Sequence, residues 1–139
     1  MTERVVVLQP GGVFDATELT ELSAVADVTV VCRSGMPSAG LRVVELAVPQ
    51  PKGPVRSLIR AAERSPVGRT LVRLTPWDEG SAFWRAARRD AAVSALLRDA
   101  SVVAAGERDG IYAAWRAQRA AKGLRAVFGI AAAREAVSA

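Results

Sequence analysis

The 139-residue sequence predicts an α/β fold, a three-layer domain in which helices cover both faces of a mostly parallel sheet of about five strands. Two observations predict it. Short apolar runs rich in valine lack alternation, which is typical of strands buried on both faces. Segments with helical periodicity lie between most of these runs, and a crossover of that length joins parallel strands. Residues 1–139 are expected to form a single domain.

The first unit of this fold begins at the start of the sequence. Residues 4–9 are the first and central predicted strand, which the turn 10–12, Pro-Gly-Gly, ends. Asp15 and, three residues later, Glu18 form the pattern of a helix amino terminus. Residues 27–32 are the next predicted strand, so the chain opens with strand, helix and strand.

The middle of the chain is less regular. A loop is expected over 33–40, and a third strand over 41–48 near a sheet edge, because its side chains alternate. Apolar residues at helical spacing predict a basic amphipathic helix over 55–64. Proline and glycine within 66–68 are expected to interrupt it before a short helix over 70–74.

One long helix is expected next, from a cap at Ser81 to Arg98. Its plausible packing positions are Phe83, Trp84, Ala87, Ala91, Ala95 and Leu96.

The last third of the chain predicts strand, turn, helix and strand. The two strands are 102–105 and 125–130. Asp109 offers a side-chain cap to the helix between them, and Gly123 can take the left-handed conformation that ends it. Residues 131–139 favour one more short helix.

Composition limits the possible chemistry. The chain has no histidine and one cysteine, Cys32, which excludes an intramolecular disulfide, a cysteine metal cluster and a Ser-His-Asp triad. Any catalysis would have to use carboxylates, arginines or backbone dipoles, and we assign no catalytic residue, metal or cofactor. The apolar runs are too short to span a bilayer, and the first residues lack a signal-peptide pattern. A cytoplasmic location without a membrane span is expected.

Charge is uneven along the chain. Residues 1–50 carry three basic and six acidic side chains, net −3, whereas residues 51–139 carry sixteen basic and eight acidic side chains, net +8. Such a basic segment is either a solvated helix face or a patch for a phosphate backbone, an anionic lipid surface or an acidic partner. The arginines concerned are Arg56, Arg60, Arg64, Arg69, Arg73, Arg85, Arg88 and Arg89.

Two loops are candidate ligand-binding sites. Gly11 and Gly12 follow the first strand, where glycines let a phosphate approach the amides at a helix amino terminus; a tight turn with positive φ explains them as well. Glu107, Arg108 and Asp109 follow the fourth predicted strand, at the edge where open α/β sheets bind ligands. A helix cap at Asp109 and a solvated loop are the alternatives.

The order of the predicted strands and helices, and the amino-acid sequences of residues 99–117 and 124–128, resemble the amino-terminal half of GT-B-type glycosyltransferases. Residues 4–12, Arg-Val-Val-Val-Leu-Gln-Pro-Gly-Gly, are similar to that family's first strand and glycine loop. The resemblance implies a Rossmann-like fold. The chain has Gly106 and Glu107 where the family tends to have histidines, and it holds no counterpart of the family's second, sugar-nucleotide-binding domain.

These departures favour a non-catalytic, glycosyltransferase-like Rossmann domain that acts as a binding or assembly module. A strand over 125–130 that ends a parallel sheet has an open edge, which invites another chain. We therefore expect the protein to form a homo-oligomer, or to pair with a separately encoded protein partner. The candidate interface residues are Arg125, Val127, Phe128 and Ile130.

Two other functions stay open. One is an enzyme subunit, related to glycosyltransferases, that binds a nucleotide or sugar nucleotide at Gly11, Gly12 and the loop 107–109. The other is an arginine-dependent nucleic-acid binder, whose affinity would fall steeply with salt. The short nucleic-acid-binding signatures are missing from the sequence, which disfavours this last function.

Overall fold

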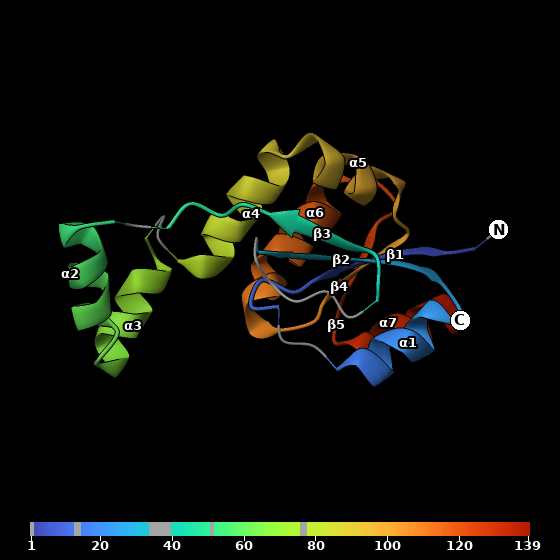
Figure 1. Cartoon of the computed structure of the whole chain (residues 1–139), viewed down its shortest axis with the longest axis horizontal. Helices are drawn as coiled ribbons and strands as arrows, with labels where there is room; N and C mark the ends of the chain where they lie inside the picture. The colour runs from blue at the N-terminus through green and yellow to red at the C-terminus, as the bar shows by residue number, and fades with distance from the viewer. Residues whose placement is uncertain (1, 13–14, 34–39, 51, 76–77) are drawn as a thin grey trace.

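The structure is a computed structural model that describes residues 2–12, 15–33, 40–50, 52–75 and 78–139. It holds a five-stranded parallel sheet of order β3-β2-β1-β4-β5 (Figure 1). The strands are β1 (Arg4–Leu8), β2 (Asp27–Arg33), β3 (Val43–Leu46), β4 (Val102–Ala105) and β5 (Arg125–Phe128). The predicted α/β class, the parallel sheet and the central first strand are confirmed.

Helices cover both faces of this sheet, as in a Rossmann-like three-layer fold (Figure 1). One face carries α1 (Ala16–Ser23) and α7 (Ile130–Ser138), and the other carries α4 (Glu79–Arg89), α5 (Ala91–Asp99) and α6 (Ile111–Ala120). Each layer of helices forms its own apolar core with the sheet between them.

Strand β1 contributes to both cores because successive side chains of a strand point to opposite faces. Val5 and Val7 pack with α1 and α7, whereas Val6 and Leu8 pack beneath α4, α5 and α6. All four side chains are buried. Burial on both faces explains why the run lacks a polar residue at every second position.

A helical hairpin, α2 (Pro54–Ala62) followed by α3 (Pro66–Arg73), projects from the body of the molecule between β3 and α4 (Figure 1). The predicted interruption at Pro66 is confirmed, because α3 begins at this proline, whereas the one at Gly68 is wrong, since this glycine lies inside α3. A Cβ atom there would collide with the backbone carbonyl of Ala62, so glycine lets the two helices approach closely. The Ser65 hydroxyl caps α3 by accepting a hydrogen bond from the Gly68 amide at 3.0 Å.

The predicted long helix is in fact two helices, α4 and α5. Asp90 separates them with an extended backbone, and its carboxylate accepts a hydrogen bond from the Val93 amide at 3.0 Å. Helix α4 also begins before Ser81, because Asp78 is its cap and accepts from the Ser81 amide at 3.1 Å. The cap predicted at Ser81 is therefore wrong.

The break at Asp90 also shifts the packing register of the second helix. Val93 and Leu97 are its buried residues. Of the three positions expected to pack there, Ala91 is exposed and Ala95 is half-buried, whereas Leu96 is half-buried and packs against the core as predicted. The three positions predicted in α4 are buried: Phe83, Trp84 and Ala87.

Several element ends differ from the prediction. Asp109 lies in a 3₁₀ turn, η1 (Arg108–Gly110), and α6 has no side-chain cap, so Asp109 does not cap that helix. Strand β3 is shorter than 41–48, and β5 ends at Phe128. Gly123 has a φ of 84°, which confirms its left-handed conformation. Apart from its two ends, the loop expected over 33–40 lies outside the described residues.

Candidate binding site at the carboxyl edge of the sheet

The strand order reverses direction between β1 and β4. In open α/β sheets, ligands bind in the crevice at the carboxyl ends of the two strands at such a point. The loop after β1 contains Gly11 and Gly12, and the loop after β4 contains residues 107–109, so both predicted candidate loops flank this crevice.

A carboxylate of the chain itself is hydrogen-bonded to the backbone amide that would otherwise donate to a phosphate. Glu107 accepts a hydrogen bond from the Gly11 amide through its Oε1. A Cβ atom at Gly11 would lie 2.8 Å from the Glu107 Oε2, so the Glu107 side chain would have to shift if another residue replaced this glycine. Gly12 has a φ of 71° and donates its amide to the Gln9 carbonyl at 2.9 Å, which confirms the tight turn.

The loop after β4 also packs directly on the end of β1. A Cβ atom at Gly110 would lie 2.7 Å from the carbonyl oxygen of Leu8, and one at Gly106 would collide with the side chain of Gln9. The two glycines therefore bring η1 against β1. This contact, together with the Glu107 bond, holds the two loops against each other at the crevice.

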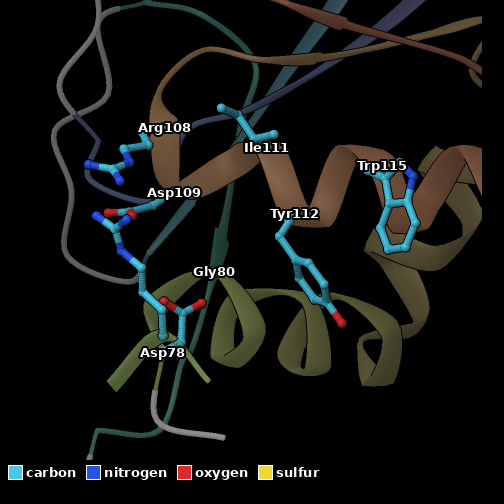
Figure 2. A pocket seen from close by; sticks show the side chains of 8 residues that line it. Asp78, Gly80, Arg108, Asp109, Ile111, Tyr112 and Trp115 are labelled. Atoms are coloured by element: carbon cyan, nitrogen blue, oxygen red, sulfur yellow. The ribbon is translucent and has the colours of Figure 1, made fainter. Parts of the chain in front are cut away.

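A cavity of about 390 Å³ opens beside the crevice, between η1, α6 and the start of α4 (Figure 2). Its lining residues are Arg73, Asp78, Gly80, Arg108, Asp109, Ile111, Tyr112 and Trp115. Figure 2 shows Asp78, the cap residue of α4, across the opening from Asp109, with Tyr112 and Trp115 farther along α6. The lining carries two carboxylates and two guanidinium groups, so its charges compensate one another.

A carboxyl pair lies next to this cavity. Burial raises the pKa of Glu79, and a hydrogen bond with the Asp109 carboxyl raises the pKa further. Arg33 opposes the shift, because its guanidinium lies 2.9 Å from the Glu79 carboxylate. The Glu79 carboxyl therefore holds its proton more tightly than an isolated carboxyl does. No sequence pattern indicates Glu79, because only the packing of α4 against η1 brings it to Asp109.

A second cavity, of about 370 Å³, lies between the end of α3, α4 and α6. We call it the arginine pocket. Its lining residues are Arg73, Leu74, Thr75, Ser81, Trp84, Arg85, Arg88, Arg89, Tyr112 and Arg116. Four of the eight arginines of the basic segment predicted from the sequence line this pocket. The other four lie on α2, on α3 and between these two helices. Arg116 was missed, because it reaches the pocket from α6.

The predicted interface residues separate into two groups. Strand β5 is an edge of the sheet, as expected, and Phe128 is 63% exposed on it. Arg125 is exposed as well, and Val127 is half-buried. Ile130, however, is the first residue of α7 and is buried in the core, so it does not belong to the open edge.

The open edge of β5 is also partly closed. Arg125 and Gly129 donate their amides toward β4, to the carbonyls of Ser101 and Ala105, so the Ala126 amide between them points to the open side. The Gln118 side chain from α6 accepts that amide at 2.8 Å. An added strand would have to displace this glutamine.

Comparisons with protein-family models, with curated proteins and with solved structures give no match. Among the described residues, no helix has the length and apolar character needed to cross a membrane. In the same part of the chain, no group of three or more cysteine, aspartate or glutamate side chains is placed to hold a metal ion.

Proposed function

We propose that the protein is a non-catalytic binding module, with a glycosyltransferase-like Rossmann ancestry, that docks on an anionic membrane surface through the α2–α3 hairpin. The observation that carries this proposal is the unpartnered apolar surface of the hairpin. Helix α2 buries none of its residues, and α3 buries only Gly68. Leu58 is 72% exposed and Leu74, just after α3, is 80% exposed.

The apolar side chains occupy one stripe of each helix. In α2, Val55, Leu58 and Ile59 follow the spacing of a helix face, and Arg56 and Arg60 occupy other positions around the axis. In α3, Val67, Leu71 and Leu74 do the same, with Arg69 and Arg73 elsewhere. A helix with a leucine and valine stripe and a polar face rich in arginine is the pattern of segments that lie in a membrane interface.

The net charge of the hairpin also favours an anionic membrane surface. Residues 52–75 hold six basic side chains and one acidic side chain, so their net charge of +5 equals that of the whole chain. The rest of the sequence carries thirteen basic and thirteen acidic side chains. An anionic bilayer supplies both an apolar layer and negative charge, and each lysine or arginine near such a surface adds about 1 kcal/mol of attraction.

A second copy of the chain fits this surface less well. Two hairpins that dock face to face would bring charges of +5 and +5 together. A nucleotide-binding function at the crevice is also less well supported, because Glu107 already occupies the Gly11 amide. Both functions are therefore alternatives that the experiment below separates from the proposal.

Vesicle flotation tests the proposal directly. The full chain is expected to float with vesicles of phosphatidylcholine that contain roughly 30% phosphatidylglycerol, and much less with phosphatidylcholine alone. Added salt should weaken the binding. The double variant Leu58→Ser with Leu71→Ser should lose it, whereas Phe128→Ser, which changes an exposed apolar residue of β5, should keep it.

Two results would contradict the proposal. One is equal binding of the double variant and the natural chain to the anionic vesicles. The other is a chain that does not bind the vesicles but forms a dimer, or a purified complex with a protein partner. In this case the same double variant abolishes that association. In that second case the hairpin would be a protein-docking surface.

Assembly through β5 is a second candidate function, and the exposure of Phe128 favours it. A large aromatic side chain on an edge strand is a typical anchor for a protein partner. Sedimentation velocity of the natural chain and of Phe128→Ser separates this candidate from the first. A concentration-dependent dimer that the substitution dissociates would support assembly through β5.

A further inference from the structure

The arginine pocket carries an inference that is independent of membrane docking. Five arginines line it, from three different elements: Arg73 ends α3, Arg116 belongs to α6, and α4 supplies Arg85, Arg88 and Arg89. None of the described residues that line it is acidic. Like charges in one pocket repel one another, so a bound anion would stabilise this arrangement.

The guanidinium groups are largely available to a ligand. With Arg85 set aside, the arginines of the pocket form no ion pair with an acidic side chain of the described residues. Arg116 lies over the ring of Tyr112, with its Cζ 6.0 Å from the ring centroid. That contact holds the guanidinium beside the pocket and leaves its N–H donors for an acceptor.

A buried donor provides a second, separate observation. Trp84 lines the pocket and is only 7% exposed, and its Nε1 is buried with no hydrogen-bond partner in the described part of the chain. A buried N–H group without an acceptor is destabilising, and most such groups in proteins are paired. Thr75 and Ser81 also line the same cavity, and the Thr75 hydroxyl already donates to the Val72 carbonyl at 2.6 Å. An anion in the pocket would offer an acceptor to the Ser81 hydroxyl, and the buried Trp84 indole N–H would reach one by a shift of its ring.

From these observations we infer that the arginine pocket binds a small molecule or headgroup that carries two phosphoryl groups. Arginine matches the planar, bidentate geometry of a phosphate better than lysine does. A single phosphate monoester carries about −1.5 to −2 charges at neutral pH, which is less than the positive charge of the arginines that line the pocket even when Arg85 is set aside. Two phosphoryl groups compensate more of this charge. The volume of about 370 Å³ lies within the range of small-ligand sites.

Two kinds of ligand could supply these phosphoryl groups. One is a soluble diphosphate, and the other is a phosphorylated lipid headgroup at the base of the hairpin. Inorganic pyrophosphate and a nucleoside diphosphate are the probes for the first source. Vesicles that contain phosphatidic acid or a lipid diphosphate are the probes for the second. Competition between pyrophosphate and these vesicles shows that both reach the same pocket.

Isothermal titration of the full chain with pyrophosphate tests the inference. One molecule is expected to bind per chain and to shift the NMR resonance of the Trp84 indole N–H. Arg88→Gln and Arg116→Gln should each weaken the binding about tenfold, because each removes a hydrogen bond between charged groups. Arg98→Gln is the matched control, since Arg98 is an exposed arginine of α5 that does not line the pocket.

Three outcomes would overturn the inference. The first is binding that sulfate reproduces at equal ionic strength. The second is binding that Arg88→Gln and Arg116→Gln leave unchanged, for the soluble probes and for the vesicles. The third is an oligonucleotide that binds more tightly than pyrophosphate and depends on the same two arginines, which would indicate a nucleic-acid surface. Leu58→Ser with Leu71→Ser should not affect pyrophosphate binding, so failure of the membrane proposal stays distinguishable.

Discussion

The Glu107 carboxylate accepts the Gly11 backbone amide across 96 positions of sequence and joins the loops after β1 and β4. These are the two loops between which a Rossmann-like sheet holds its ligand. In this chain, a carboxylate takes the place that a phosphate oxygen would need. Because of this bond, the Gly11 amide of the glycine turn is not free to bind an anion.

Glu107→Ala tests the structural role of this bond. The variant leaves a half-buried amide without its acceptor, and we expect it to lower the free energy of unfolding by about 1 to 2 kcal/mol. Urea denaturation followed by circular dichroism measures the change. Glu135→Ala, on the exposed side of α7, is the control and should stay within about 0.5 kcal/mol of the natural chain. Equal stability of the two variants would show that the bond contributes nothing.

The sequence predicted the sheet well, because its strands are buried on both faces. The valine-rich runs of β1 and β2 lack a polar residue at every second position. This pattern is typical of short strands that are buried on both faces. Their parallel pairing followed from the helical segments between them. The edge strand β3 was overestimated in length, since alternation continues past the last residue that pairs with β2.

The candidate sites were harder to predict, because they depend on contacts between distant elements. The two predicted loops do meet, but the sequence does not show that Glu107 would bond to Gly11 instead of a ligand. The arginine pocket needs Arg88 and Arg116 on neighbouring faces of α4 and α6. Such convergence is a property of helix packing, which no single segment encodes.

Asp90→Ala tests the break between α4 and α5. The Asp90 carboxylate caps α5 at the Val93 amide, and loss of such a cap typically lowers stability by about 1 kcal/mol. Ser81→Ala, at the cap that the sequence predicted, should change stability by less than about 0.5 kcal/mol, because Asp78 caps α4 instead. Thermal and urea unfolding of the two variants compare them. A larger effect at Ser81 than at Asp90 would contradict the assigned caps.

Gln118→Ala tests the protection of the β5 edge. Removal of the side chain leaves the Ala126 amide unpaired on the open edge, which should lower stability by about 1 kcal/mol. The uncovered edge should also promote self-association, visible as a larger mass in light scattering at high concentration. Gln50→Ala, an exposed glutamine outside the helices and strands, is the control. A variant with unchanged mass and stability would show that Gln118 does not protect the edge.

The carboxyl pair predicts a pH dependence of stability. Burial and the hydrogen bond with Asp109 raise the pKa of Glu79 above its ordinary value of 4.5, so the folded chain keeps a proton that the unfolded chain has lost. The stability that this proton contributes is complete below pH 4.5 and is lost as the pH rises through the folded-state pKa. Because 53% of the Glu79 side chain is exposed, solvent screening keeps the contribution small.

Two variants separate the causes of this shift. Arg33→Gln should raise the pKa of Glu79 further, because the substitution removes the nearby positive charge that favours the ionised carboxylate. Asp109→Asn should lower the pKa, because it removes the neighbouring negative charge. Carbon-13 NMR titration of the Glu79 carboxyl carbon measures both shifts, and Glu79→Gln assigns the resonance. A Glu79 pKa at or below 4.5 in the natural chain would contradict the pairing with Asp109, since the Arg33 charge would then dominate.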